Sequence, residues 1–122
     1  MADTLDLYKA CEELTDFWSP RIVAEVNDTL VKVAKVRGEF AWHDHAHEDE
    51  LFHVLRGTLV MQYEDRDDVT IQAGEIHLVP RGVRHCPQAD EECWIMLVEP
   101  AATQHTGDEV TPLTKSLAQQ RG

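Results

Sequence analysis

The chain has 122 residues, with 11 basic and 23 acidic side chains and a formal net charge of −12. This length predicts one domain with one hydrophobic core, and a hydrophobic content of 43% excludes a disordered chain. The acidic balance argues against binding to nucleic acid or to anionic membranes, because both interactions need clustered lysine and arginine side chains.

The sequence shows no targeting or membrane signal. The longest uncharged apolar stretch near a predicted strand, Cys93–Val98, is far shorter than the ~20 residues of a transmembrane helix. The start of the chain, residues 1–6, is acidic where a signal peptide would be basic. Cys11, Cys86 and Cys93 lack the spacing of a disulfide framework, so we expect reduced thiols in a cytoplasmic protein. A Cys86–Cys93 disulfide is the alternative, and the predicted compartment disfavours it.

The chain opens on an amphipathic pattern that predicts a helix over residues 3–17. Its apolar positions near helical spacing are Leu5, Tyr8, Leu14 and Phe17. Asp3 or Thr4 is the expected N-cap, and Ser19-Pro20 is expected to end the helix. We expect this helix to pack against the core or against a partner chain.

From Arg21 the apolar residues alternate, which is typical of strands. The predicted strands are 22–26, 30–36, 51–55, 58–63, 69–72, 76–79 and 93–98. Turn signals separate them: Asn27-Asp28 and Pro80-Arg81-Gly82 are expected turns, Gly38 is expected to break the second strand, and Ala89–Glu92 is expected to form a turn. No helix-length pattern interrupts residues 21–99, so the sequence predicts an all-β sandwich or barrel and argues against a parallel α/β sheet.

Beyond Pro100 the apolar pattern fades. Residues 101–114 are polar and are expected to form a loop, and residues 116–120 have the composition of a last helical turn. The expected organisation is a single domain over residues 1–122, with the helix at 3–17, the β-barrel at 21–99 and a tail at 100–122.

The segment 42–52 carries a concentration of metal-ligand side chains. His43, His45 and His47 lie within five residues. On an extended strand, His43 and His45 point to the same face, and two imidazoles with a carboxylate soon after form the core of a transition-metal site. A solvated loop rich in histidine and acids is an equally weighted alternative for this segment alone. A zincin helix is disfavoured, because its glutamate directly follows the first histidine.

A second segment, Gly74–His85, combines a short strand, a Pro-x-Gly turn and a histidine. Together the two segments resemble the paired motifs of the cupin superfamily. The first motif reads here as Gly38, four residues, His43-Asp44-His45, four residues, Glu50, six residues and Gly57. The second reads as Gly74, five residues, Pro80-Arg81-Gly82, two residues and His85, with Ala89 where asparagine is usual. The other departure is one residue fewer after Gly38.

This resemblance implies a double-stranded β-helix, the jelly-roll barrel of cupins. It also implies that His43, His45, Glu50 and His85 are ligands of one divalent transition metal. Three neutral imidazoles and a carboxylate suit Mn, Fe, Ni, Zn, Co or Cu, and the sequence does not distinguish among these ions. The family's asparagine is not a metal ligand, so Ala89 leaves the expected ligand set complete.

The closer resemblance is to small, single-domain bacterial cupins of the second type, which are similar to mannose-6-phosphate isomerase. It rests on the pattern of residues 42–52 and on Glu99-Pro100 with residues 106–108. The resemblance implies a metal-dependent enzyme acting on a small polar organic molecule, as an isomerase, a lyase or a dioxygenase. A non-enzymatic metal-bearing sensor or small-ligand module is the alternative. Because cupins commonly pair, it also implies a homodimer.

Alternation along the strands predicts which other side chains reach the pocket. Phe52 shares the face of Glu50, whereas His53 does not and is expected to point outward. His47 is expected to be a solvated loop residue. The predicted pocket-lining residues are Phe52, Tyr63, His77, Trp94 and Met96. Alternation also permits the opposite choice on the last strand, with Cys93, Ile95 and Leu97 inward, and no residue is assigned a catalytic role.

Overall fold

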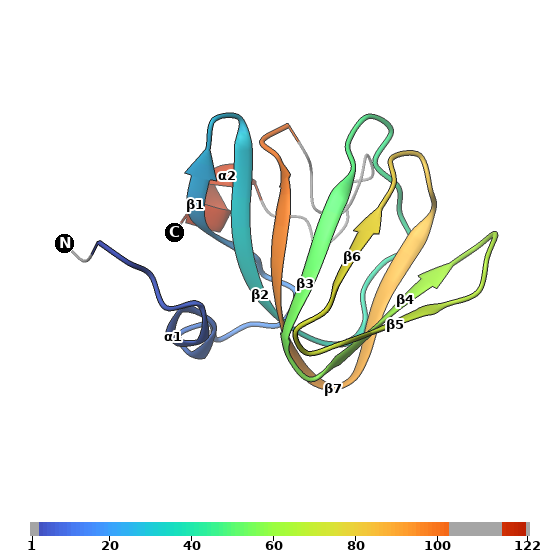
Figure 1. Cartoon of the computed structure of the whole chain (residues 1–122), viewed down its shortest axis with the longest axis horizontal. Helices are drawn as coiled ribbons and strands as arrows, with labels where there is room; N and C mark the ends of the chain where they lie inside the picture. Colours follow the sequence, from blue (N-terminus) through green and yellow to red (C-terminus); the bar gives the residue numbers. More distant parts are fainter. Residues whose placement is uncertain (1–2, 103–115, 122) are drawn as a thin grey trace.

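The computed structural model describes residues 3–102 and 116–121. Nearly all of its regular structure is antiparallel β-sheet, with one short helix near each end of the chain (Figure 1). In chain order the elements are α1 (Leu7–Glu12), β1 (Arg21–Val26), β2 (Thr29–Glu39), β3 (Glu50–Arg56), β4 (Thr58–Tyr63), β5 (Val69–Gln72), β6 (Ile76–Val79), β7 (His85–Pro100) and α2 (Leu117–Arg121).

The 16-residue strand β7 connects the two halves of the sheet. Its second half lies between β2 and β3, which gives the strand order β1-β2-β7-β3-β6. Its first half pairs with β4, which in turn pairs with β5. The sheet therefore curves around an interior, as expected for a barrel in which one strand belongs to both walls.

A bulge in β2 and β7 replaces two predicted breaks. Gly38 does not end β2: it takes a φ of +78°, and the strand continues to Glu39. Val36 pairs with Cys93 while Gly38 pairs with Ala89, so residues 90–92 have no partner on β2. The predicted turn at Ala89–Glu92 was wrong for this reason, because these polar residues form an exposed bulge within a continuous strand.

The N-terminal helix is shorter than predicted. Helix α1 covers only Leu7–Glu12, and the side chain of Asp6 caps it by accepting hydrogen bonds from the backbone N–H groups of Tyr8 and Lys9 at 2.9 and 3.2 Å. The prediction of residues 3–17, with a cap at Asp3 or Thr4, was therefore wrong at both ends. Trp18 instead lies alongside β2, where its backbone N–H donates to the Lys35 carbonyl at 2.9 Å.

Two apolar clusters lie on the two faces of the sheet. The inner cluster fills the barrel and includes Phe52, Ile95 and Leu97. The outer cluster packs α1 against the sheet, and its buried residues are Ala10, Cys11, Val33, Leu55 and Trp94. Helix α1 thus covers the outer face of the sheet, beside β2 (Figure 1), and the prediction that it packs against the body of the protein is confirmed.

The end of the chain agrees with the predicted helical turn where it is described. Helix α2 occupies Leu117–Arg121, and Arg121 forms a 2.7 Å ion pair with Glu25 of β1. Most of the expected loop, residues 103–115, lies outside the described part of the chain. The division of residues 1–122 into a single domain stays a prediction. Within the described ranges, neither helix has the length and apolar content needed to cross a bilayer.

Candidate metal centre

Backbone pairing brings the two predicted motifs together. His43 and His45 lie in the connection between β2 and β3, Glu50 is the first residue of β3, and His85 is the first residue of β7. The backbone groups of His43 and His85 hydrogen-bond to each other in both directions, at 2.9 and 2.8 Å. The Gly82 N–H donates to the carbonyl of His45 at 2.7 Å, so the turn before β7 also holds this segment.

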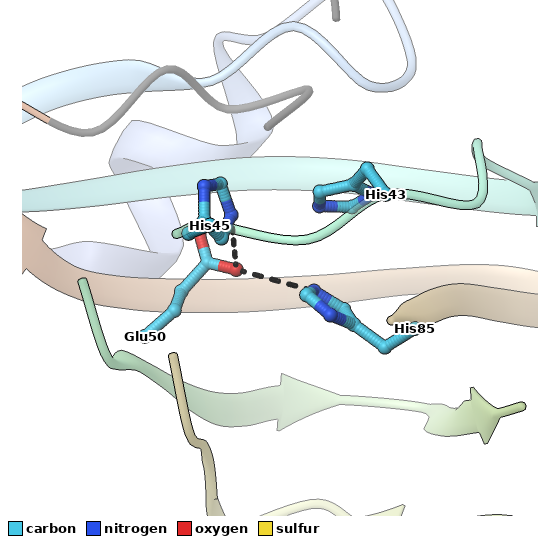
Figure 2. A group of neighbouring side chains, drawn as sticks. All are labelled: His43, His45, Glu50 and His85. Carbon is cyan, nitrogen blue, oxygen red and sulfur yellow. Dashed lines mark ion pairs between the residues drawn. The ribbon is translucent and has the colours of Figure 1, made fainter. Parts of the chain in front are cut away.

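The four side chains converge inside the barrel (Figure 2). One ligand atom from each of His43, His45, Glu50 and His85 lies within 4.8 Å of the others. The Glu50 Oε1 atom is 3.5 Å from the Nε2 atom of His45 and 3.8 Å from that of His85. All four residues are at most 3% exposed, so solvent contributes little to satisfying these polar atoms.

Backbone carbonyl groups orient two of the imidazole rings. The Nδ1 atom of His43 is 2.7 Å from the Ala41 carbonyl oxygen, and that of His85 is 2.8 Å from the Val83 carbonyl oxygen. Each Nδ1–H therefore donates to a carbonyl, which leaves the lone pair on Nε2. These two Nε2 atoms are buried without a hydrogen-bond partner, an arrangement that costs free energy unless a cation accepts the lone pairs. The residues therefore fit a divalent metal ion.

The electrostatic environment favours the ligand forms of these groups. Burial, and to a smaller extent the neighbouring His85, lowers the pKa of His43 from 6.5 to about 4, so the ring is neutral at pH 7. Burial raises the pKa of Glu50, but contacts with Glu99, His45 and His85 outweigh it and hold this pKa well below 4.5. Neutral imidazoles and an ionised carboxylate are the forms that bind divalent cations.

A cavity of about 40 Å³ opens beside the cluster. His43 and Glu50 are part of its wall, together with Glu99 from β7. The rest of the wall is almost entirely apolar and includes Trp18, Ala34, Val36, Phe40, Phe52, Ile95 and Leu97. Trp18 and Phe40 stack on each other with ring centroids 4.8 Å apart, and the edge of Phe40 meets His43. A ligand in this cavity would thus have the candidate metal donors on one side and hydrophobic surface around the rest.

The predicted pocket-lining residues divide into three groups. Phe52 lines the cavity as predicted. Tyr63 and His77 are absent from the described cavity wall and form a separate inner pair, with Tyr63 Oη 2.5 Å from His77 Nε2. The predictions for Trp94 and Met96 were wrong, because β7 turns these two side chains outward against the cluster around α1.

Four residues around the site were missed by the sequence interpretation. Alternation could have placed Glu99 on the inward face, since it follows Ile95 and Leu97 at two-residue steps and lines the same cavity. Lys32 lies in phase with Ala34 and Val36, but a lysine at an inward position is ordinarily assigned to the surface. Trp18 and Phe40 are brought to the site by the path of the chain outside the predicted strands, which periodicity does not show.

The chain is thus a small antiparallel β-barrel with a buried cluster of three histidines and one glutamate that could hold a metal ion. Residues 29–99 match the model of the Cupin domain family, and the chain belongs to this family. The resemblance to cupins and the expected all-β cupin fold with a short N-terminal helix are confirmed. The finer likeness to mannose-6-phosphate isomerase stays a prediction.

A solved structure and two curated proteins show how the chain relates to other cupins. The crystal structure of a cupin-2 domain containing protein from Shewanella frigidimarina is 46% identical and superimposes with a TM-score of 0.76, covering 79% of this chain and 93% of that one. The uncharacterized protein YdbB of Bacillus subtilis is 40% identical over 63 residues, which are 52% of this chain and 56% of that protein. A 3-hydroxyanthranilate 3,4-dioxygenase of Brucella anthropi is 35% identical over 68 residues, 51% of this chain and 37% of the enzyme. The chain thus spans about half or less of the length of the curated relatives it matches.

Proposed function

We propose that this protein is a divalent-metal-dependent enzyme in which His43, His45, Glu50 and His85 hold one ion beside the substrate cavity. The observation that carries the proposal is the convergence of four buried donor groups, from two separate motifs, next to a cavity. A bound ion would act as a Lewis acid on an oxygen atom of the substrate. Mn, Fe, Ni, Co, Cu and Zn all accept this set of nitrogen and oxygen donors.

The cavity favours a particular kind of small molecule. Its wall combines aromatic and aliphatic side chains from Trp18, Phe40 and Ile95 with acidic groups only on the side of the cluster. A substrate with an apolar or aromatic body and one or two oxygen donors would place the donors near the ion and the body against this wall. Trp18 and Phe40 would then shield the bound molecule from water.

The type of reaction is the second part of the proposal. Isomerases, lyases and dioxygenases all fit a cupin with an open metal site, since fold alone does not define the reaction. The 35% identity to a 3-hydroxyanthranilate 3,4-dioxygenase over 68 residues supports the dioxygenase class, as does the apolar cavity. We therefore propose oxidation of a small hydroxylated or amino-substituted aromatic compound by O₂.

Oxygen consumption tests this proposal. Protein purified without a histidine tag is loaded anaerobically with Fe(II), and hydroxylated and amino-substituted benzoates are added with O₂. We expect consumption of O₂ with at least one of these compounds, loss of turnover in His85→Ala and unchanged turnover in His47→Ala, since His47 is exposed. A folded, iron-loaded protein that consumes no O₂ would contradict the dioxygenase proposal. Thermal shifts on adding ligand without any turnover of a wider substrate panel would instead support a sensor or small-ligand module.

The outer face of the sheet supports a homodimer. Val31, Val98, Leu51 and Leu78 are paired across four neighbouring strands and form one apolar row on this face. Leu78 is 52% exposed, and Ile76 beside it is 64% exposed. We propose that a second copy covers this row, and light scattering should give twice the chain mass; a monomer at high concentration would contradict it.

We also propose a cytoplasmic location, with which the three free, buried cysteines agree.

A further inference from the structure

A lysine and a glutamate are buried together beside the cavity, with Glu99 in its wall and Lys32 behind Glu99. Lys32 is 0% exposed and Glu99 is 1% exposed, and the Lys32 Nζ atom lies 2.6 Å from Glu99 Oε1. Lysine and glutamate are almost never fully buried unless they are paired. The other ion pairs between described acidic and Lys or Arg side chains involve partly or largely exposed groups.

Strand register brings this pair against the candidate metal ligand Glu50. Lys32 on β2 is in phase with the cavity residue Ala34, and Glu99 on β7 is in phase with the cavity residue Leu97. Leu51 of β3 pairs with Val98 of β7, so the next positions along the two strands are Glu50 and Glu99. The side chains of Glu50 and Glu99 are in contact. Lys32 pairs with Leu97 rather than with Glu99, so its side chain reaches Glu99 diagonally across β2 and β7. Lys32, Glu99 and Glu50 thus form one inward group on three neighbouring strands.

Stability alone does not account for this buried group of charged residue types. A buried ion pair is commonly no more stabilising than apolar side chains of the same volume, which would suit the apolar wall here. A carboxylate that ligates a metal, in contrast, is held in orientation by neighbouring polar groups. Glu99 contacts Glu50 on one side and Lys32 on the other, and Lys32 is absent from the described cavity wall. Glu99 thus links Lys32 to the candidate metal ligand Glu50.

We propose that Lys32 and Glu99 form a buried brace that positions the Glu50 carboxylate for the metal ion. In this arrangement Lys32 fixes Glu99, and Glu99 restricts the rotation of the Glu50 side chain. Both are positioning residues rather than ligands. The inference rests on the ion binding of the proposed function, and it does not depend on which reaction the site performs.

The double substitution K32M/E99L separates positioning from stability. It removes the ammonium group and the carboxyl group together and keeps similar volumes, so we expect a folded protein whose Tm stays within a few degrees of wild type. We expect its Co(II) affinity, measured by calorimetry, to fall by roughly 10- to 100-fold. The visible absorption bands of bound Co(II) should also change, because they report the geometry of the ligands. Val33→Ala is the matched control: Val33 is the next residue on β2 but packs under α1, so its loss should lower Tm and leave Co(II) affinity and spectrum unchanged.

Co(II) affinity and spectrum equal to wild type in K32M/E99L would overturn the proposal. If this variant does not fold, Glu99→Gln provides the decisive measurement, since glutamine keeps the shape of the side chain. Weakened binding with an altered spectrum in Glu99→Gln would support the brace, and wild-type binding would overturn it. A wild-type protein that binds no ion would overturn both this inference and the proposed function. A wild-type protein that binds Co(II) but turns over no substrate would contradict only the enzyme proposal.

Discussion

At the scale of single residues, the site depends on imidazole rings whose proton positions are set by the backbone. The carbonyl groups of Ala41 and Val83 accept from the Nδ1–H groups of His43 and His85. Each ring therefore keeps the lone pair of its Nε2 atom available to a metal ion, and burial keeps His43 neutral. The metal-free protein thus holds ligand atoms in place at the cost of burying polar groups without partners.

The lowered pKa of His43 makes the stability of the metal-free protein depend on pH. Its pKa falls from 6.5 to about 4 on folding. Between these values the unfolded chain binds more protons than the folded chain, so stability is lost as the pH falls through this window. By pH 4 the protonation of His43 lowers the free energy of unfolding by about 3 kcal/mol, because each unit of pKa shift corresponds to about 1.4 kcal/mol. Urea unfolding at pH 7 and at pH 4.5 should measure this loss.

His43→Gln should reduce the loss of stability on acidification, because glutamine does not titrate. The matched control is His47→Gln, which changes an exposed histidine and should leave the pH dependence of wild type intact. Equal pH dependence in His43→Gln and wild type would show that His43 titrates normally in the folded state.

The sequence predicted the candidate metal ligands but not the buried Lys32–Glu99 pair beside them. His43, His45, Glu50 and His85 stand at motif spacings that identify them in a single sequence, and the fold places them together. Lys32 and Glu99 have no such spacing, and their pairing depends on the register of β2 against β7. Charged residues in an alternating pattern are ordinarily assigned outward, so a buried pair is missed.

At the scale of elements, the turn between β3 and β4 depends on one glycine. Gly57 has a φ of +88°, and a Cβ atom there would lie 3.0 Å from the Glu92 carbonyl oxygen and 3.2 Å from the Cys93 Cα atom. Both contacts are with the backbone of β7, which also bends at this point around the bulge of residues 90–92. The turn, the bulge and the inner wall of the barrel therefore constrain one another.

Gly57→Ala and Gly74→Ala distinguish close packing from backbone conformation. Gly74 has nearly the same φ, +89°, but nothing lies within 4 Å of an added Cβ atom. We expect Gly74→Ala to cost on the order of 1 kcal/mol from its positive φ, and Gly57→Ala to cost at least about 1–2 kcal/mol more from the steric contact. Chemical denaturation measures both free energies of unfolding. Equal losses of unfolding free energy in the two variants would show that the backbone of β7 moves to accommodate the added Cβ atom without a loss of stability.

The strands were largely predictable, whereas the helix and the bulge were not. Alternation located each of β1 to β6, because the sheet buries one side and leaves the other for solvent or α1. The polar residues at 90–92 have the composition of a turn, and only their pairing shows that they bulge from β7. Helix α1 ends at Glu12 because residues 17 and 18 lie along β2, a tertiary contact that overrides the helical pattern of residues 3–17.

At the scale of the whole molecule, the two faces of the sheet carry different features. The inner face carries the metal-ligand cluster, the cavity and the Lys32–Glu99 pair. The outer face carries α1 and the apolar row that includes Leu78. Sequence alternation predicted that two faces exist, but it did not determine which side of β7 is the inner one, since both sides carry large apolar residues. Only packing against α1 assigns Trp94 and Met96 to the outside.

The metal content of untagged protein tests the central claim most directly. Elemental analysis and calorimetry, after reconstitution with Mn(II), Fe(II), Co(II), Ni(II) or Zn(II), should give one ion per chain. His45→Ala and His85→Ala should keep the β-rich circular dichroism of wild type and lose this ion, because the remaining donors cannot complete the site. A wild-type protein that binds no divalent ion would contradict the account, as would variants that bind one ion as tightly as wild type.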